Sequence, residues 1–411
     1  MAHLGRGVAI IGAGYAGMAA AVTLAEKNIP VTVFESGPVP GGRARRITTQ
    51  GTELDNGQHI LIGAYTELYR MMSKVGVPGD ALLRVPLEIR YAREFSFRRL
   101  WLPEPFGLAG GLLTARGLPF GERLGAAKFI ARMRAGGFRI EHDISVSQLL
   151  AQEKQGSRVA HYLWRPLCVS ALNTPPDLAS ARVFLAVLRD TLGGEAEASD
   201  LLLPRVDLSK LFPEPAAEFV RSRGGEVRLQ TPVKDLAALR ESFDRIIVAV
   251  GPHQLKTVLP DAPEYSYQPI YTCYLQYGER ARLPFPMVGL SDGLVQWVFD
   301  RGALLGEKGR MACVISAQGD HQQLSLDELA QACEREMAAA GLAKEKPQWA
   351  RVIAEKRASI TCSPGAKPLP KMESILFAGD YTDPEYPPTL EAAVRSGIRA
   401  AKSVIPYPVR N

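Results

Sequence analysis

Near its start the chain reads Val8-Ala-Ile-Ile-Gly-Ala-Gly-Tyr-Ala-Gly17, a short apolar run followed by three glycines in the spacing Gly-x-Gly-x-x-Gly. The next residues, Met18 to Asn28, predict a helix that ends before Pro30, and Val31-Thr-Val-Phe34 predicts a second buried strand that Glu35 closes. Strand, glycine turn, helix and strand in this order are typical of a βαβ unit that binds a dinucleotide. We therefore predict a Rossmann-type sheet, with the alternative that the glycine turn binds no ligand.

In such a unit the first glycine allows a tight turn, the second lets the backbone approach a pyrophosphate, and the third lets the helix pack closely on the strand. The phosphates then lie against free N–H groups at the N-terminus of the helix. Glu35 stands 18 residues after the last glycine, where a carboxylate accepts hydrogen bonds from a ribose and repels the 2′-phosphate of NADP. The residues of this unit expected to contact the cofactor are Gly12, Ala13, Gly14, Tyr15, Ala16, Gly17 and Glu35.

Two further motifs favour FAD over NAD. They are Gly41-Gly-Arg-Ala-Arg45, after the second predicted strand, and Phe377-Ala-Gly-Asp380, which precedes a helix expected from Thr389. A flavin is longer than a nicotinamide and needs protein from a distant segment, and the N-terminus of a helix suits the flavin edge where negative charge collects on reduction. The expected contacts here are Gly41, Gly42, Arg43, Gly379, Asp380, Thr389 and Leu390.

Together these motifs resemble the amine oxidase and carotenoid desaturase superfamily of FAD enzymes. Two other blocks, Trp164-Arg-Pro-Leu-Cys-Val-Ser-Ala-Leu-Asn-Thr-Pro175 and Ser199-Asp-Leu-Leu-Leu-Pro-Arg-Val-Asp-Leu208, are similar to its squalene-associated branch, the hydroxysqualene dehydroxylases of hopanoid-making bacteria. The resemblance runs over nearly the whole chain and implies an α/β fold, with a Rossmann-type FAD-binding domain and an interleaved α+β substrate domain. We expect residues 1–80, 205–265 and 355–411 in the first domain, and 81–204 and 266–354 in the second, which would bind substrate and face a membrane.

The resemblance also implies an activity, the reductive removal of the hydroxyl of hydroxysqualene to give squalene. By the same analogy Val233 would meet the adenine through its backbone, at the end of a strand after Gly224-Gly225. Gly57, Gln58 and His59 would lie beside the isoalloxazine ring.

Replacing C–OH by C–H requires the hydroxyl to leave as water while a hydride arrives, and a general acid assists that departure. Asp55 and His59 are the candidates for this acid, with the alternative that Asp55 caps backbone amides and His59 is an ordinary core histidine. Aromatic side chains would stabilise the cation that the departing hydroxyl leaves behind. The alternative for each aromatic candidate is that it is an ordinary core residue. The candidates near the substrate are Trp164, Cys168, Asn173, Trp297 and Tyr381, with Tyr274 and Tyr386 as further aromatics.

Charge is distributed unevenly along the chain. The 411 residues contain 49 Lys and Arg against 43 Asp and Glu, a net charge of +6, whereas residues 84–139 contain eleven Lys or Arg against four Glu, a net charge of +7. Large apolar side chains interleave with these charges: Phe95, Phe97, Trp101, Leu102, Phe106, Leu112, Leu113, Phe120 and Phe129. This composition favours contact with an anionic membrane surface, the alternative being a solvated basic face over core aromatics. Residues 103–121 contain eight Gly or Pro and predict no regular element.

Other classes have little support. The sequence shows no recognition helix, so nucleic-acid binding is not expected. The five cysteines and six histidines show no metal-ligand spacing, so no metal is expected. No run approaches the roughly 20 apolar residues of a membrane-spanning helix, and no signal peptide precedes Val8. We expect a cytoplasmic protein, peripheral on the cytoplasmic face of the membrane.

Three other functions stay open on this fold. One is a desaturase that removes hydrogens from a linear C30 or C40 isoprenoid, and another is an amine oxidase. The third is a non-catalytic lipid-binding escort, against which the intact motifs at 41–43 and 378–380 argue. No second Gly-x-Gly-x-x-Gly follows a strand, so a separate nicotinamide domain is not expected and the source of electrons is open.

Overall fold

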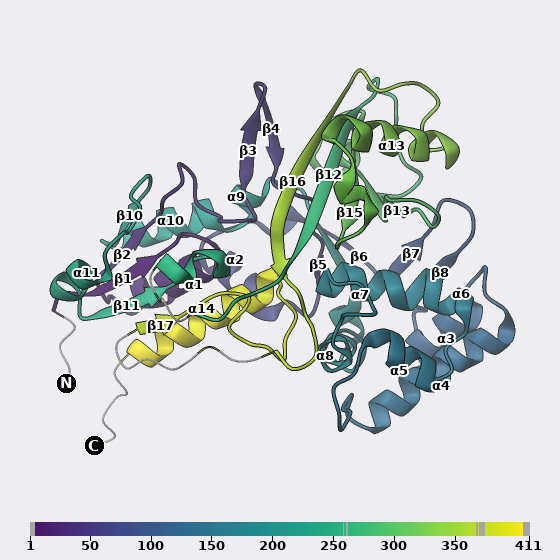
Figure 1. Ribbon diagram of the computed structural model, residues 1–411, viewed down its shortest axis with the longest axis horizontal. Coiled ribbons are helices and arrows are strands. Elements are labelled where there is room, and N and C mark those ends of the chain that lie inside the picture. The colour runs from purple at the N-terminus through teal and green to yellow at the C-terminus, as the bar shows by residue number, and fades with distance from the viewer. Residues whose placement is uncertain (1–4, 258, 260–261, 367–368, 370–374, 406–411) are drawn as a thin grey trace.

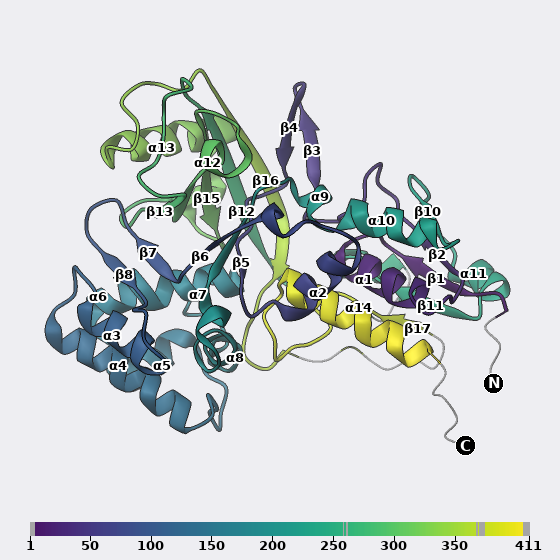
Figure 2. The ribbon, with the colours of Figure 1, turned by 180° about the vertical axis from the view of Figure 1, so that it is seen from behind.

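The computed structural model describes residues 5–257, 259, 262–366, 369 and 375–405. A parallel sheet and its helices form one end of the molecule, a second sheet rises from its middle, and a group of helices forms the other end (Figures 1 and 2). The predicted α/β class is therefore confirmed.

The parallel sheet gathers strands from three distant parts of the chain in the order β10-β2-β1-β11-β17. Its strands are β1 (Val8–Ile11), β2 (Val31–Phe34), β10 (Glu226–Arg228), β11 (Arg245–Val248) and β17 (Ile375–Phe377). Four helices pack around it: α1 (Tyr15–Ala25), α10 (Pro213–Ser222), α11 (Leu236–Ser242) and α14 (Leu390–Val404). Every residue of β1 and α1 is buried, as expected for the central strand and first helix of a Rossmann-type unit.

Gly17 shows why this unit requires glycine. A Cβ added there would lie 1.9 Å from the carbonyl oxygen of Gly12, so any side chain would push α1 away from the end of β1. The predicted strands at 8–11 and 31–34 are confirmed, and the helix starts at Tyr15, three residues earlier than predicted, because its first turn begins directly at Gly14. The strand predicted up to Val233 was too long: β10 ends at Arg228 and Val233 lies in the loop that follows.

The second sheet is antiparallel and has the order β13-β14-β15-β12-β16. Its strands are β12 (Tyr267–Gln276), β13 (Met287–Gly289), β14 (Trp297–Asp300), β15 (Arg310–Ser316) and β16 (Trp349–Ile360). Helix α13 (Leu326–Ala339) covers one face, and α12 (Arg301–Leu305) follows β14. Strand β16 runs across residues 354 and 355, where the sequence suggested a domain boundary, so the predicted division cuts through a single strand.

The helical end contains α3 (Phe106–Thr114), α4 (Phe120–Ala135), α5 (Val146–Gln152), α6 (Ser157–Val159), α7 (Arg165–Leu172) and α8 (Ala181–Leu192), with a π-helical turn at Ala160–Trp164. Short strands connect it to the rest: β5 (Leu61–Ile62), β9 (Leu201–Pro204) and β6 (Leu82–Val85) form one sheet, and β7 (Glu88–Arg90) pairs with β8 (Ser96–Arg98). The hairpin of β3 (Arg46–Thr49) and β4 (Thr52–Asp55), with α2 (Thr66–Lys74) and α9 (Leu208–Leu211), completes these elements.

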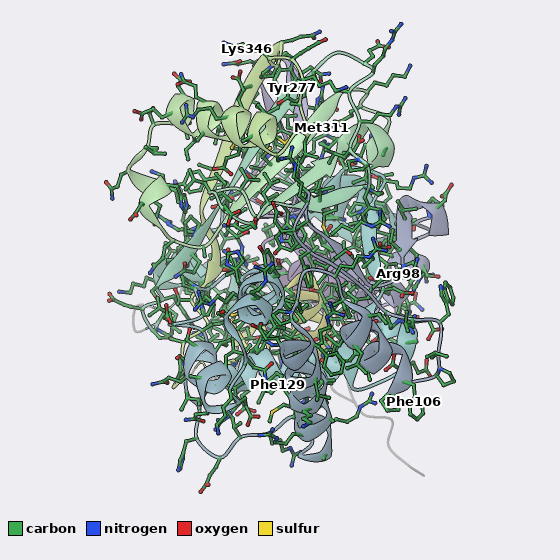
Figure 3. The ribbon with its side chains drawn as sticks, turned by 90° about the vertical axis from the view of Figure 1, so that its right-hand side faces the viewer. Arg98, Phe106, Phe129, Tyr277, Met311 and Lys346 are labelled. Carbon is green, nitrogen blue, oxygen red and sulfur yellow. The ribbon has the colours of Figure 1, made fainter. Side chains whose placement is uncertain are left out.

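Helix α3 corrects a prediction, because residues 103–121 were expected to be irregular. The glycines of this segment serve close packing instead: a Cβ at Gly111 would lie 2.5 Å from the carbonyl oxygen of Arg98. Gly111 therefore lets α3 approach the end of β8. The side chains of this region differ in their environment, since Phe129 is fully buried and Phe106 lies at the edge of the molecule (Figure 3).

Among the described helices, none combines the length and the apolar character that crossing a membrane requires. All five cysteines are buried and form no disulfide. Within the described ranges, no group of three or more His, Cys, Asp or Glu side chains is arranged to hold a metal ion.

Candidate active site

A cavity of about 880 Å³ lies where the carboxyl ends of the parallel strands meet the antiparallel sheet. This position is where open α/β sheets bind ligands, and the volume lies within the roughly 300–1,000 Å³ of small-molecule and cofactor sites. Most of the residues expected at the cofactor line it: Gly12, Gly14, Tyr15, Ala16, Glu35, Gly41, Gly42, Arg43, Gln58, His59, Val233, Gly379, Asp380, Thr389 and Leu390. The structure thus brings together motifs that are more than 300 residues apart in the chain.

Two glycine loops meet at one end of the cavity. The backbone N–H of Gly41 donates to the carbonyl of Ala13 at 2.8 Å, and a Cβ at Gly42 would lie 3.2 Å from the Cα of Gly14. No described side chain caps the N-terminus of α1, where Gly14 is the N-cap residue. The N–H groups of the first turn therefore face an open, side-chain-free surface, which fits a pyrophosphate.

Glu35 supports this loop from the end of β2. Its carboxylate accepts the N–H of Ala13 at 2.8 Å and the N–H of Gly37 at 2.7 Å. A carboxylate offers about four lone-pair sites, so Glu35 retains acceptor capacity for the hydroxyls of a ribose. Its position beside the cavity therefore fits the adenosine end of a dinucleotide.

Arg43 and Asp380 form an ion pair across the cavity wall, with Nη2 at 2.5 Å from Oδ1. Nη1 of Arg43 donates to the carbonyl of Ala358 in β16 at 2.7 Å. This contact connects the second glycine motif to the C-terminal motif and to the antiparallel sheet. Behind it, α14 points its N-terminus at the cavity, where the Thr389 hydroxyl accepts the N–H of Ala392 and the helix dipole favours negative charge.

These observations meet the requirements of FAD. Glycine loops and a helix N-terminus suit its diphosphate, Glu35 suits its ribose, and the N-terminus of α14 suits the flavin edge. Of the residues expected at the cofactor, three do not line the cavity. Ala13 contributes its N–H to Glu35, Gly17 packs on Gly12, and Gly57 is buried with a φ of +100°.

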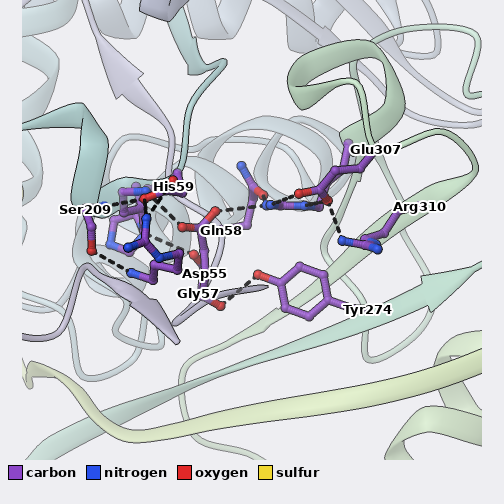
Figure 4. Close-up of polar contacts among 12 residues, drawn as sticks. Asp55, Gly57, Gln58, His59, Ser209, Tyr274, Glu307 and Arg310 are labelled. Atoms are coloured by element: carbon purple, nitrogen blue, oxygen red, sulfur yellow. Dashed lines mark hydrogen bonds and ion pairs between the residues drawn. The ribbon is translucent and has the colours of Figure 1, made fainter. Parts of the chain in front are cut away.

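Asp55 does not face the cavity. Its Oδ1 accepts the N–H of Leu208 at 2.9 Å, its Oδ2 lies 3.1 Å from Nη1 of Arg301, and its backbone carbonyl accepts the hydroxyl of Tyr274 (Figure 4). Burial raises the pKa of Asp55, and the neighbouring Arg301 opposes that rise. The geometry agrees with the structural alternative for Asp55, a carboxylate that caps an amide and pairs with a buried arginine.

His59 lines the cavity with Nδ1 at 3.4 Å from the carbonyl oxygen of Gly57. Burial lowers its pKa to about 4, while the contact with Gly57 acts in the opposite direction. The imidazole is therefore neutral near pH 7, and because a carbonyl only accepts, Nδ1 carries the proton. A neutral ring has no readily released proton, so the site gives little support to His59 as a general acid.

The residues suggested for substrate fall into two groups. Trp297, Asn173 and Tyr381 line the cavity, where the indole N–H of Trp297 donates to Ser170 at 2.9 Å. Trp164 and Cys168 instead lie in the core of the helical end, outside the described cavity lining; the indole of Trp164 donates to Gln155 at 2.9 Å and packs against Phe129. Tyr274 and Tyr386 are likewise outside that lining, next to Arg301 and Arg395 respectively.

Nothing in the sequence singled out Arg301, a fully buried arginine of the site region. Its side chain is 1% exposed and contacts Asp55, Glu307 and Gln58. The only available signal was an Asp300-Arg301 pair directly after the apolar Trp297-Val-Phe299, which also describes an ordinary end of a strand.

Comparisons with known proteins agree with this geometry. Residues 15–405 match the family of flavin containing amine oxidoreductases. Curated hydroxysqualene dehydroxylases from Sinorhizobium fredii and Rhodopseudomonas palustris are 27% and 28% identical, over 96–97% of this chain and 97–98% of theirs. A zeta-carotene desaturase from Arabidopsis thaliana is 22% identical over 97% of this chain and 85% of its own.

Solved structures show the same fold. Cyclohexylamine oxidase from Brevibacterium oxydans has a TM-score of 0.65 at 16% identity, covering 97% of this chain and 98% of its own. An oxidoreductase from Methanosarcina mazei has a TM-score of 0.70 at 14% identity, covering 96% of this chain and 99% of its own. The resemblance inferred from the motifs is thus confirmed: the chain belongs to the flavin-containing amine oxidoreductase family and is an FAD-dependent oxidoreductase.

Proposed function

We propose that the protein is a hydroxysqualene dehydroxylase, which converts hydroxysqualene to squalene. The observation that carries this proposal is the likeness to three curated hydroxysqualene dehydroxylases over 95–97% of the chain, which includes both ends of the cavity. In the overall reaction the C–O bond breaks, a C–H bond forms, and the hydroxyl leaves with a proton as water. When bound in its reduced form, FAD would supply the two electrons as a hydride.

The division of the cavity supports an isoprenoid alcohol as substrate. Its glycine loops, with Arg43 and Asp380, are suited to hold the cofactor, whereas the antiparallel sheet contributes an apolar wall of Ile270, Trp297, Phe299 and Val314. Apolar side chains of this kind exclude water and accept a hydrocarbon chain. Gln58 and His59 supply polar groups beside that wall.

Burial lowers the pKa of His59 to about 4, so its ring is neutral at pH 7. We therefore do not assign His59 as the acid that protonates the leaving hydroxyl. We assign His59 the role of a hydrogen-bond partner, with Nε2 as acceptor. Asp55 accepts the N–H of Leu208 and pairs with Arg301, and we assign it a structural role behind Gln58 and His59.

The reaction is tested by incubating the anaerobically reduced holoenzyme with hydroxysqualene and analysing the product by mass spectrometry. Squalene is the expected product. The likeness to zeta-carotene desaturases favours a desaturase as the second candidate. Products with additional double bonds, formed from squalene by the oxidised enzyme, would support that candidate, and a purified protein without a flavin spectrum would support a lipid-binding escort.

We further propose that the helical end binds an anionic membrane from the cytoplasmic side. Trp101, Phe106 and Phe120 are 81%, 66% and 68% exposed, and Leu102, Leu113 and Leu124 of the same segment are exposed as well. Arg98, Arg116 and Lys128 are also exposed there, and basic residues near an anionic surface contribute about 1 kcal/mol each. Phe95, Phe97, Leu112 and Phe129 are core residues and do not belong to this exposed group, contrary to the simplest interpretation of the sequence.

Binding to phosphatidylcholine vesicles with and without phosphatidylglycerol tests the membrane contact. Replacing Trp101, Phe106 and Phe120 together by Ala should weaken binding to the anionic vesicles at least about tenfold, because each loses buried apolar area in the bound state. Leu326→Ala, at an apolar residue that starts α13 and is 50% exposed, is the control and should bind like the unmodified protein. The proposal fails if the protein ignores anionic vesicles at physiological salt or if the triple variant binds unchanged.

A further inference from the structure

We propose that Arg301 is a positioning residue that fixes the side-chain amide of Gln58 with its N–H₂ group, and not its carbonyl, turned toward the cavity. The wall beside His59 then presents a hydrogen-bond donor to whatever oxygen lies against it. For a substrate oxygen this inference rests on the proposed function; for a flavin oxygen it does not.

Two carboxylates and an aromatic ring hold the Arg301 guanidinium in one orientation. Nε and Nη2 donate to the two oxygens of Glu307 at 2.7 and 3.0 Å, and Nη1 lies 3.1 Å from Oδ2 of Asp55. Arg310 donates to Glu307 at 3.0 Å, so that two guanidinium groups face two carboxylates and the cluster is electrically balanced. The ring of Tyr274 packs 5.3 Å from the centre of the guanidinium. A planar fork held on both sides has no freedom to turn.

Gln58 is the fourth contact of this guanidinium. Nη1 of Arg301 donates to Oε1 of Gln58 at 3.1 Å (Figure 4). An arginine offers only donors, so the amide can meet it only through its carbonyl oxygen. The alternative amide orientation would bring two sets of N–H groups together at the same distance and lose this hydrogen bond.

The consequence lies at the other end of the amide. Gln58 lines the cavity, and within the described part of the chain its Nε2 donates to no protein acceptor. An amide nitrogen carries two N–H donors. The cavity wall therefore carries a fixed donor at Gln58 next to the neutral ring of His59, and a ligand oxygen that accepts a hydrogen bond is the group that this wall recognises. Two oxygens have this chemistry, the hydroxyl of the alcohol substrate and a carbonyl of the flavin ring.

Three variants distinguish these cases: Gln58→Met, Arg301→Lys and the double variant. Gln58→Met removes the amide at similar length and leaves the contacts of Arg301 with Asp55 and Glu307 in place. Arg301→Lys keeps the positive charge but not the fork that reaches three partners. Two equilibrium readouts are taken without turnover: the affinity of the oxidised holoenzyme for hydroxysqualene and for squalene, and the dissociation constant of FAD in the absence of lipid.

If the donor meets the substrate, each single variant weakens hydroxysqualene binding about tenfold and leaves squalene binding unchanged, as expected for one lost hydrogen bond. If it meets the flavin, FAD affinity falls by a similar factor and both lipids are affected alike. In either case the double variant is no weaker than Gln58→Met alone, because Arg301 acts through Gln58. A merely structural role of Arg301 predicts instead that the two losses multiply.

Losses that multiply in the double variant, or a Gln58→Met variant with unchanged lipid and FAD affinity, would overturn the inference. Should Arg301→Lys fail to fold, Gln58→Met still decides whether the amide is used, and Gln58→Glu decides its orientation. A carboxylate there presents only acceptors to the cavity and should weaken the same affinity more than Met does. A wild-type enzyme that binds neither lipid contradicts the proposed function alone, since the FAD measurement still tests the amide.

Discussion

The two walls of the cavity are built in different ways. The wall formed by the parallel sheet consists largely of backbone, where Gly14 pairs with Gly41 and a Cβ on Gly42 would lie 3.2 Å from the Cα of Gly14. The wall that contains Gln58 depends on side chains, and Asp55, Arg301 and Glu307 hold it through buried ionic contacts. The first should be sensitive to added volume and the second to lost charge.

This difference also determines how each wall fails. Adding a methyl group to a glycine loop pushes two chain segments apart but leaves no charge unpaired. Removing one charge from the other wall leaves its partner buried without compensation, which is among the most costly single changes in a protein.

Arg301→Met should cause the largest loss of stability, about 3–5 kcal/mol, because it leaves the buried Asp55 carboxylate unpaired. The measurement is the free energy of unfolding from denaturant titration. Arg70→Met is the matched control: its partner Glu67 sits one helical turn away at the surface of α2, so less than about 1 kcal/mol should be lost. Equal losses in the two variants would show that the side-chain wall does not depend on its buried charge.

His59 should make the same wall sensitive to acid. Its pKa is lowered to about 4 in the folded protein, against about 6.5 in an unfolded chain, so the unfolded state binds the proton more readily. The stabilisation associated with the neutral ring is complete above about pH 6.5 and is lost as the pH falls toward about 4.

The expected loss over this interval is about 2–3 kcal/mol. The free energy of unfolding is measured at pH 7 and at pH 4 for the unmodified protein and for the His59→Asn variant, which cannot be protonated at this position. The gap between them should change by that amount, with the variant the less sensitive to acid. A gap that stays constant with pH would mean that His59 titrates normally in the folded state.

Gly17→Ala should break the backbone wall. The added Cβ would lie 1.9 Å from the Gly12 carbonyl, so α1 must shift, at a cost of about 1–3 kcal/mol and with loss of most bound FAD. Gly121→Ala is the control, because nothing lies within 4 Å of a Cβ at that position in α4 and alanine favours a helix. FAD content by absorbance and unfolding free energy are measured together. Full FAD occupancy in Gly17→Ala would refute the close approach.

The same contrast explains how much of the molecule could be predicted from its sequence. The backbone wall follows from local spacing: the glycines at 12, 14 and 17, the two strands around them and the acid at 35 lie within one βαβ unit. That this wall would contact Asp380 was predictable only because the C-terminal motif Phe377-Ala-Gly-Asp380 has a local pattern of its own. The contacts of Arg301 with Asp55 and Gln58 span more than 240 residues and have no local pattern, so the sequence did not reveal them.

The glycines of residues 103–121 led to a wrong prediction because they serve tertiary packing and not a turn. The eight Gly and Pro between residues 103 and 121 predicted irregular chain, yet α3 forms there because Gly107 and Gly111 let a helix approach residues 98–102 closely. Helix propensity alone opposes such a helix, and packing outweighs it. Trp164 shows the converse, since a family-specific position suggested substrate contact and the side chain lies in the core.

The smallest predicted effect compares a helix that begins at the cavity with one that lies outside the described cavity lining, by removing the hydroxyl cap of each. Thr389 caps α14 through its hydroxyl, and Ser325 caps α13 in the same way, so Thr389→Ala and Ser325→Ala should each lose about 1 kcal/mol of stability. Only α14 begins at the cavity, where its N-terminus favours negative charge, whereas α13 lies on the antiparallel sheet away from the described cavity lining. FAD affinity, measured by titrating the apoprotein, should therefore fall several-fold in Thr389→Ala and stay unchanged in Ser325→Ala. An equal change in both would mean that helix stability, and not the orientation of α14 toward the cavity, determines how well the cofactor is held.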